Sequence, residues 1–241
     1  MLLAAGLGSR MTAAGSLEIK PLLEVAGVPV LYRALAQLEL AGCDRVVVVV
    51  GYRAGEIEAA LDRFAPGFRL PIELVHNPEF HLRNGVSLLA AAGRLPETFV
   101  LAMADHVVGE EVMALARRHE PEPGGATLLV DRRIESVFDL ADATKVATRQ
   151  GRVLAIGKEI AAFDAIDIGV FVGTRGLLDA LAAVRAERGD ASLSEGVEWL
   201  AREGRMSVLD IEGGFWQDVD TPEMLAHAET ELARRAAAGR R

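Results

Sequence analysis

Aspartates at two distant places in the sequence are of the residue type that binds a divalent cation. Asp105 closely follows the apolar run 98–103, and Asp218 and Asp220 lie far along the chain. Mg²⁺ in proteins commonly takes one or two carboxylates, and phosphate oxygens and water complete its coordination. These aspartates therefore suit a magnesium site next to a phosphorylated ligand. Asp220 has a second interpretation, as the cap of a helix that begins at Pro222.

A glycine-rich loop follows the short apolar run 1–5. Gly6 and Gly8 let the backbone turn sharply and come close to a ligand, and successive free N–H groups in such a loop can bind an anion. Arg10 adds a bidentate donor that suits phosphate oxygens. The loop is neither a Walker A motif nor a dinucleotide fingerprint, because it lacks the Gly-Lys-Ser/Thr of the first and the third glycine of the second. On its own, the pattern is also compatible with an ordinary turn after a strand.

Composition and charge exclude several classes of protein. The 241 residues carry a formal net charge of −9, so the basic surface of a nucleic-acid-binding protein is absent. Cys43 is the only cysteine, which excludes an intrachain disulfide and a cysteine-based zinc cluster. No apolar run approaches the ~18 residues that a membrane helix needs, and no secretory signal is visible. We therefore expect a cytoplasmic protein without nucleic-acid or membrane partners.

Strands and helices alternate in the first part of the chain. We expect strands at 1–5, 46–50, 72–75 and 98–103, and helices at 29–40, 54–64 and 84–95. This alternation predicts an α/β fold with a Rossmann-like, doubly wound sheet that is mixed but mainly parallel. Ligands of such sheets bind beyond the carboxyl ends of the strands. The glycine loop, the segment 77–87 and Asp105 all fall at such ends.

The second part of the chain is less regular, but no linker separates it as a domain of its own. We expect strands at 126–130, 145–148, 152–156, 166–172 and 206–211, and helices at 177–186, 193–202 and from Pro222 through Leu232. The sequence thus predicts one domain over 1–232, in which 111–232 is built onto the sheet of 1–110. The tail 233–241 is expected to fray.

The glycine loop is followed by a second short motif. Residues 3–11 read Leu-Ala-Ala-Gly-Leu-Gly-Ser-Arg-Met, and Lys-Pro-Leu-Leu follows at 20–23. Together these stretches resemble the opening of the sugar-phosphate nucleotidyltransferases, within the MobA-like NTP transferase family, although Ile19 stands where that family usually has proline. The resemblance implies a GT-A-like nucleotidyltransferase fold with a nucleotide-binding half at 1–110 and an acceptor-binding half at 111–232.

The resemblance also implies roles for two basic residues and for the carboxylates. Arg10 would hold the β- and γ-phosphates, and Lys20 would neutralise the phosphate under attack; the alternative for Lys20 is a solvated loop lysine. The family has two metal-binding aspartates. One matches Asp105 of this chain, and the other matches either Asp218 or Asp220. Relatives with sugar-nucleotide products favour Asp218, and relatives with CMP-linked products favour Asp220.

The segment 77–87 resembles the stretch that reads the base in this family. Asn84 and Ser87 are the candidates for distinguishing a pyrimidine by its donor–acceptor pattern. The alternative is a plain loop followed by a helix that Asn84 caps. The residues implied to bind the nucleotide are Leu3, Ala4, Ala5, Gly6, Gly8, Ser9, Asn77, Asn84, Gly85 and Ser87.

Lys158 matches the place of the lysine that holds the acceptor's phosphate in relatives. A cation is needed there, because the attacking phosphate oxygen is itself anionic and approaches another anion. Lys145 is a second candidate, and Asp167 and Gly169 would line the acceptor site. His106 has no second histidine at zinc-ligand spacing, so we interpret it as a packing or acceptor-binding residue.

Three stretches, at 103–107, 131–132 and 142–146, look most like inositol-1-phosphate cytidylyltransferases, which make CDP-inositol from CTP and inositol 1-phosphate. Many of these relatives are fused to a membrane-embedded transferase; this chain has no such segment and resembles the stand-alone form. We therefore expect Mg²⁺-dependent, in-line transfer of CMP without a covalent intermediate. Phosphocholine, a phosphonate or a hexose 1-phosphate as acceptor, and guanine or uracil as base, remain alternatives. So does a catalytically silent nucleotide-binding regulatory module.

Overall fold

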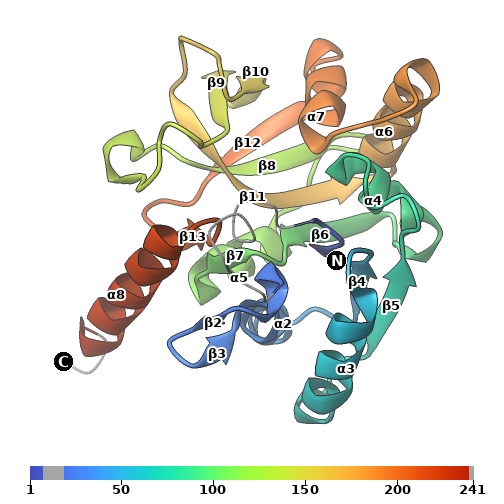
Figure 1. Cartoon of the computed structure of the whole chain (residues 1–241). Coiled ribbons are helices and arrows are strands. Elements are labelled where there is room, and N and C mark those ends of the chain that lie inside the picture. Colours follow the sequence, from blue (N-terminus) through green and yellow to red (C-terminus); the bar gives the residue numbers. More distant parts are fainter. Residues whose placement is uncertain (8–18, 239–241) are drawn as a thin grey trace.

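The computed structural model describes residues 1–7 and 19–238, and its central feature is a nine-stranded mixed sheet (Figure 1). Its strands follow the order β5-β4-β1-β6-β11-β8-β12-β10-β9. Their bounds are Ile72–His76 (β5), Val46–Val50 (β4), Leu2–Ala4 (β1), Thr98–Met103 (β6), Ala165–Thr174 (β11), Ala126–Asp131 (β8), Met206–Asp210 (β12), Arg152–Gly157 (β10) and Lys145–Arg149 (β9). The strands expected from apolar runs are therefore all present, with shifts of a few residues at their ends.

The sheet has a parallel part and an antiparallel part. β5, β4, β1 and β6 are parallel neighbours, as the alternation of strands and helices predicts. β11 runs antiparallel to both β6 and β8, and β10 runs antiparallel to β12 and β9. The sheet as a whole is therefore mixed rather than mainly parallel. The antiparallel direction of β9 and β10 has a local cause. Gln150 and Gly151 both adopt positive φ, which is the backbone of a two-residue turn, and this turn joins the two strands as a hairpin.

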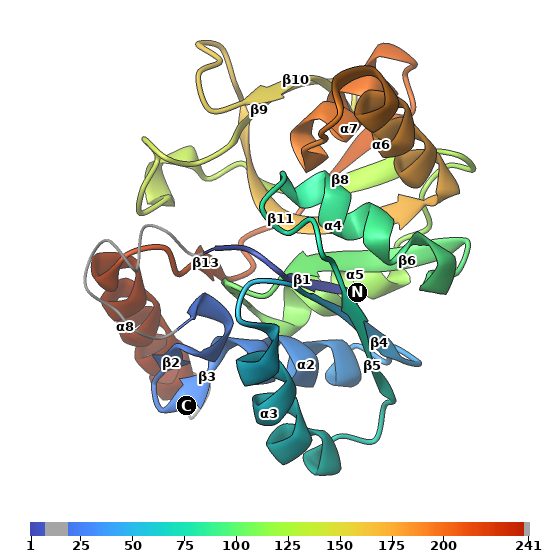
Figure 2. The ribbon, with the colours of Figure 1, turned by 45° about the vertical axis from the view of Figure 1, so that its right-hand side comes forward.

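Helices cover both faces of the sheet (Figure 2). One face of the sheet is covered by three helices, α2 (Val30–Leu40), α3 (Ala54–Phe64) and α5 (Glu110–Arg118). Their apolar side chains form one buried cluster with the strand residues that point to this face. α4 (Asn84–Ala90), α6 (Arg175–Arg188) and α7 (Leu193–Arg202) share the cluster on the opposite face. Val46–Val50 is buried at every position because both of its faces are covered. The expected α/β fold with helices on both faces of the sheet is thus confirmed.

Two small elements bring the end of the chain to the carboxyl end of β6. β7 (His106–Val108) pairs antiparallel with β13 (Trp216–Asp218), and the hairpin of β2 (Glu24–Val25) and β3 (Val28–Pro29) lies nearby. α8 (Pro222–Ala238) packs against this region through a third apolar cluster. Short 3₁₀ helices complete the described chain at Lys20–Leu22, Ala65–Gly67, Ala92–Arg94 and Ile134–Ser136.

The last helix is longer than expected. α8 continues past Leu232 to Ala238, so residues 233–238 of the predicted frayed tail are helical, in keeping with the high helix propensity of their arginines and alanines. Residues 239–241 lie outside the described part of the chain. Among residues 1–7 and 19–238, no helix is both long and apolar enough to cross a membrane.

Candidate active site

A cavity of 440 Å³ lies where the parallel strands end and the second half of the chain begins. Residues of both predicted halves of the chain, 1–110 and 111–232, line this cavity, so a single site can be formed by the two halves together. The predicted site residues that line it are Asn84, Asp105, His106, Lys158, Asp167, Gly169, Asp218 and Asp220. Eight residues foreseen from the sequence thus share one cavity, although they come from positions as far apart as 84 and 220.

Lys20 lies beside two of the predicted metal carboxylates. Its Nζ forms an ion pair with Oδ1 of Asp220 and lies 3.8 Å from Oδ2 of Asp105. The side chains of Lys20 and Asp220 are largely buried, and that of Asp105 is partly exposed, at 31%. The hydroxyl of Thr221 accepts a hydrogen bond from the backbone N–H of Met224 at 3.3 Å, so Thr221 caps α8 while the side chain of Asp220 faces Lys20.

The pairing of β7 with β13 explains why these groups meet. In its register Asp218 lies opposite His106, and the backbone N–H of Val219 donates to the carbonyl of Asp105 at 2.9 Å. Asp218 itself accepts hydrogen bonds from the amide of Gln217 through its carboxylate and its carbonyl, at 2.9 and 3.0 Å. The backbone therefore places Asp105 and the 218–220 segment side by side.

Charges in the cavity shift the pKa values of Asp105 and His106. Burial alone would raise the pKa of Asp105, but the hydrogen bond and charge of His106 and the charge of Lys20 outweigh it and lower that pKa from 3.8 to about 2. Burial likewise works against protonation of His106, yet Asp105, Asp218 and Asp167 together raise its pKa. Asp105 is therefore ionised at neutral pH, and ionised carboxylates are the kind of oxygen ligand that Mg²⁺ prefers. Within residues 1–7 and 19–238, no group of three or more His, Cys, Asp or Glu side chains could hold a metal ion, so any ion there has fewer protein ligands of these types.

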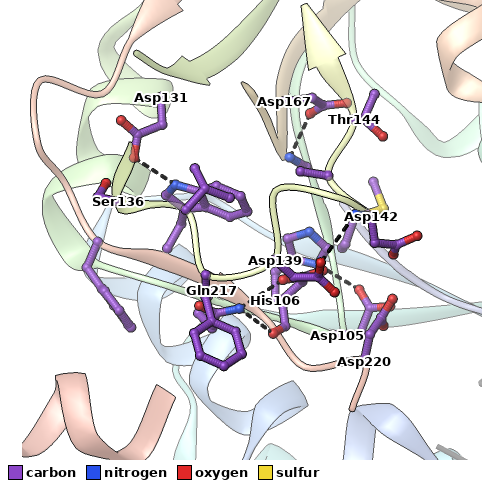
Figure 3. Close-up of a pocket in the computed structure, with 18 of the residues that line it drawn as sticks. Asp105, His106, Asp131, Ser136, Asp139, Asp142, Thr144, Asp167, Gln217 and Asp220 are labelled. Carbon is purple, nitrogen blue, oxygen red and sulfur yellow. Dashed lines mark hydrogen bonds and ion pairs between the residues drawn. The ribbon is translucent and has the colours of Figure 1, made fainter. Parts of the chain in front are cut away.

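The side of the cavity that is predicted to bind the acceptor is shaped by an irregularity in β11. The register of β11 against β8 shifts between Asp167 and Phe171. Asp167 Oδ1 accepts the backbone N–H of Gly169 at 2.8 Å, and Gly169 adopts a φ of 73° (Figure 3). Burial raises the pKa of Asp167 from 3.8 to about 6. Irregularities of this kind often re-aim side chains next to active sites.

The two predicted acceptor lysines have different surroundings. Lys158 lines the cavity and donates to Asp142 Oδ1 at 2.5 Å. Lys145 does not line it; its ammonium donates to the carbonyls of Lys158 at 2.7 Å and Ala143 at 3.4 Å, and lies 5.9 Å from the ring centre of Phe163. Lys145 therefore ties the backbone beside Lys158, and direct binding of the acceptor by either lysine stays a prediction.

The predicted nucleotide-binding residues at the start of the chain are partly described. Leu3, Ala4 and Ala5 are buried in β1 and just after it, and Gly6 is exposed. Their side chains belong to the apolar core, so any contact of Leu3–Ala5 with a ligand would be through the backbone. Gly8, Ser9 and Arg10 lie outside the described residues.

The segment 77–87 is held rigidly. Asn77 and Ser87 are buried and hydrogen-bonded to each other, with 3.0 Å between Nδ2 and Oγ. Asn84 does not cap α4, because Arg83 occupies the N-cap position; instead Asn84 Oδ1 accepts the backbone N–H of Leu193 at 2.9 Å. A side chain at Gly85 would approach the carbonyl oxygen of Ala191 to 2.7 Å, which explains the glycine by packing.

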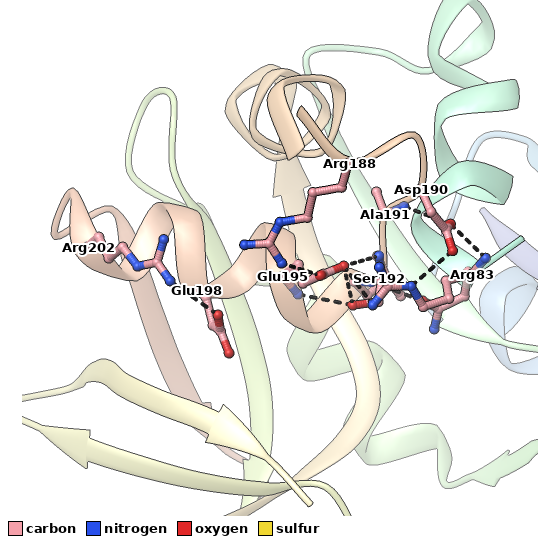
Figure 4. A network of polar contacts seen from close by, with 10 residues as sticks. Arg83, Arg188, Asp190, Ala191, Ser192, Glu195, Glu198 and Arg202 are labelled. Atoms are coloured by element: carbon pink, nitrogen blue, oxygen red, sulfur yellow. Dashed lines mark hydrogen bonds and ion pairs between the residues drawn. The ribbon is translucent and has the colours of Figure 1, made fainter. Parts of the chain in front are cut away.

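A network of charged groups ties this segment to the connection between α6 and α7 (Figure 4). Asp190 accepts the backbone N–H and the Nε–H of Arg83 at 3.0 and 3.1 Å, and it also accepts the backbone N–H of Ala191. Glu195 completes a capping box with Ser192 and pairs with Arg83 at 3.1 Å. The segment expected to read the base therefore has a fixed position relative to the acceptor half.

Sequence reasoning missed one part of the cavity wall. Asp131 is 2% exposed and accepts hydrogen bonds from the guanidinium of Arg133 and, at 2.9 Å, from Nε1 of Trp216 (Figure 3). Phe138, in the loop after β8, stacks on His227 of α8 with ring centres 4.4 Å apart. Asp131 followed by Arg132 was part of the inositol-type resemblance, but the contact with Trp216, 85 positions away, leaves no local pattern in the sequence.

Comparisons with known proteins show what this chain is similar to. Residues 1–203 match the family described as "MobA-like NTP transferase domain". The chain is 37% identical over 241 residues to the "Bifunctional IPC transferase and DIPP synthase" of Rubrobacter xylanophilus, which covers 98% of this chain and 52% of that protein. It is 35% identical over 240 residues to the protein of the same name from Thermococcus kodakarensis, with 99% and 51% covered. The chain thus spans about half the length of these relatives.

Solved structures show the same fold. The inositol-1-phosphate CTP transferase from T. maritima superimposes with a TM-score of 0.79 at 24% identity, covering 95% of this chain and 94% of that one. The crystal structure of a UDP-glucose pyrophosphorylase complexed with UDP-glucose gives a TM-score of 0.76 at 15% identity, with 97% of each chain covered. At these identities the likeness shows the α/β nucleotidyltransferase fold alone, which the sequence predicted.

Proposed function

The chain belongs to the MobA-like NTP transferase family, and we propose that it transfers CMP from CTP to inositol 1-phosphate, giving CDP-inositol and pyrophosphate. The names of its relatives support this choice: two that are 35–37% identical are called IPC transferases, and the T. maritima structure is of an inositol-1-phosphate CTP transferase. Because those relatives are about twice as long, the proposal concerns only the reaction that a domain of this fold performs.

The meeting of Lys20, Asp105 and Asp220 is the single observation that carries the proposal. Two carboxylates face one ammonium group at the edge of the sheet where ligands bind. Ionised carboxylates are hard oxygen ligands, so the residues fit Mg²⁺. When bound, Mg²⁺ would neutralise charge on the triphosphate. Lys20 stands where a cation can stabilise the phosphate under attack.

Asp220 is our choice for the second metal carboxylate, with Asp218 as the alternative. Asp220 pairs with Lys20, next to Asp105, whereas Asp218 Oδ1 is held by the amide of Gln217. The capping bond at the start of α8 comes from the hydroxyl of Thr221, which accepts the backbone N–H of Met224. The choice agrees with the resemblance to relatives that make CMP-linked products.

The acceptor would lie against Lys158, His106, Asp167 and Gly169, all in the cavity wall. Lys158 offers the positive charge that offsets repulsion between two phosphates. The attacking group is the acceptor's own phosphate oxygen, so no covalent intermediate on the protein is required. Arg10 completes the proposal as a ligand of the β- and γ-phosphates.

The proposal is tested by measuring pyrophosphate release from the purified protein with Mg²⁺. CTP, UTP, GTP and dTTP are each combined with inositol 1-phosphate, phosphocholine, 2-aminoethylphosphonate and glucose 1-phosphate. We expect release above background for CTP with inositol 1-phosphate. A different preferred pair would replace the substrates but keep the reaction class. Tight binding of CTP without turnover for any pair would contradict an enzymatic function.

A further inference from the structure

The carboxylate of Asp105 is held by the side chain next to it. Nδ1 of His106 lies 2.8 Å from Oδ1 of Asp105 (Figure 3). An ionised carboxylate can only accept, so Nδ1 carries the hydrogen of this bond. The bond occupies Oδ1, and the other oxygen, Oδ2, is the one that lies 3.8 Å from the Lys20 ammonium. The imidazole thus leaves Oδ2 directed toward the place that Asp105 shares with Asp220.

The imidazole is itself held from two sides. The backbone of His106 is paired with Asp218 in the β7–β13 ladder. The ring lies against Gly169, where an added Cβ would come within 2.8 Å of Nε2 and 3.0 Å of Cδ2. Gly169 also has a φ of 73°, which side-chain-bearing residues rarely adopt. The irregularity of β11 at Asp167 therefore presents a bare backbone to the ring.

We propose that His106 is a positioning residue, which fixes the Asp105 carboxylate for the metal through its Nδ1, and that Gly169 is required because it leaves room for the ring. The proposal rests on the metal site proposed above and gives His106 and Gly169 a task in addition to their place in the wall of the acceptor site. Partners that orient metal-binding groups typically contribute 10–100-fold to metal affinity.

Two polar substitutions of His106 distinguish the role of Nδ1 from the role of Nε2. The amide of Asn reaches the place of Nδ1, whereas the amide of Gln reaches the place of Nε2. We expect His106→Asn to keep Mn²⁺ affinity within about threefold, and His106→Gln and His106→Leu to weaken it 10–100-fold. Mn²⁺ binding to the protein–CTP complex is measured by electron paramagnetic resonance, and the Mg²⁺ concentration for half-maximal rate is measured beside it. If His106→Gln retained metal affinity while His106→Asn raised the KM of the acceptor, Nε2 would be an acceptor ligand and the proposal would be wrong.

A double-mutant cycle tests the role of Gly169. Gly169→Ala should weaken Mn²⁺ binding in the wild-type background, because the new methyl group displaces the ring. It should weaken binding much less on top of His106→Asn, whose shorter side chain has no atom at the place of Nε2. Equal effects of Gly169→Ala in both backgrounds would show that the two residues act independently and would overturn this part of the proposal.

Matched controls distinguish this inference from the metal site on which it depends. His119 bonds Thr127 at 2.9 Å, and neither lines the cavity, so His119→Gln should leave Mn²⁺ affinity unchanged. Asp105→Asn should abolish the affinity. If Asp105→Asn kept it, the metal site itself would be wrong. If Asp105→Asn lost it while His106→Gln kept wild-type affinity, only the positioning role would be wrong.

Discussion

Lys20 and Asp220 form an ion pair across 200 positions of the sequence, and the same ammonium group lies 3.8 Å from Asp105. The pair depends on two features of the fold. The 3₁₀ turn Lys20–Leu22 lies near the carboxyl end of the parallel strands, and the β7–β13 ladder brings the C-terminal segment to the residue that follows β6. These two features together bring Lys20, Asp105 and Asp220 to one place.

Removal of the Asp105 carboxylate should abolish turnover without unfolding the protein. We expect Asp105→Ala to lower kcat by about a thousandfold, the range seen when one group that stabilises transition-state charge is removed. Pyrophosphate release gives the rate, and the thermal midpoint should stay within a few degrees of wild type. A variant that is folded and retains near wild-type activity would show that the metal is held elsewhere.

The two carboxylates near the end of the chain should behave differently. Asp220→Asn should reduce kcat about as strongly as Asp105→Ala, because Asp220 shares the Lys20 site. Asp218→Asn should have a smaller effect, since the ion pair with Lys20 beside Asp105 is made by Asp220. Rates measured at saturating Mg²⁺ and CTP compare the two variants. The reverse order would assign the metal to Asp218.

Asp167 should make stability depend on pH. Burial raises its pKa from 3.8 to about 6, so the folded protein binds this proton more tightly than the unfolded chain does. The resulting stabilisation is complete below pH 3.8 and is lost as pH rises through about 6. Its size is roughly 3 kcal/mol, from the energy of one pKa unit multiplied by the shift. Urea unfolding should show that Asp167→Asn gains stability relative to wild type between pH 4 and pH 7. A constant difference between the two proteins across this range would contradict the raised pKa.

The cluster of Asp131, Arg133 and Trp216 should stabilise the cavity wall. Asp131 accepts from the backbone N–H, Nε and a terminal nitrogen of Arg133 and from Trp216, so Asp131→Ala leaves several donors without their acceptor. We expect a loss of about 2–3 kcal/mol in the free energy of unfolding. Trp216→Phe removes only one donor and should cost about 1 kcal/mol in the same urea experiment. Equal losses for the two variants would mean that packing of the indole, and not its hydrogen bond, dominates.

The network around Asp190 should fix the segment 77–87 for the nucleotide. Asp190→Ala removes the acceptor of the Arg83 backbone N–H, so we expect the KM for CTP to rise severalfold with kcat within about twofold. Hydrogen exchange of residues 79–88 should become faster. Glu198→Ala is the matched control, because it breaks only the exposed pair with Arg202 on α7, worth about 0.5 kcal/mol. A rise in the acceptor KM alone would assign the network to the other substrate.

Much of this fold follows from local sequence patterns. The run of valines at 46–50 is a buried strand, and the stripe of Ile57 and Leu61 places α3 against the sheet. The long-range pairing of β13 with β7 could not be predicted in this way, because two three-residue strands carry no periodicity. The antiparallel direction of β11 was also hidden, since a strand buried on both faces has the same apolar character in either direction.

The residues of the candidate site could likewise be predicted only in part. Asp105, Lys20 and the 218–220 segment were predicted from the types and motifs of their residues, and the structure brings them together. The carbonyl contacts of Lys145 and the bond between Asn84 and Leu193 were not predicted, because they depend on how separate loops pack. Local motifs thus indicate which residues meet, while the packed loops decide which atoms of each side chain remain directed toward the cavity.

The most direct test of the account follows the label from α-³²P-CTP in the presence of inositol 1-phosphate and Mg²⁺. We predict that the label moves into a CDP-linked inositol, with one pyrophosphate released for each product, and that Asp105→Ala and Asp220→Asn abolish the transfer. Label that stays in CTP under these conditions, or that appears only in free CMP, would contradict the transfer of CMP to this acceptor.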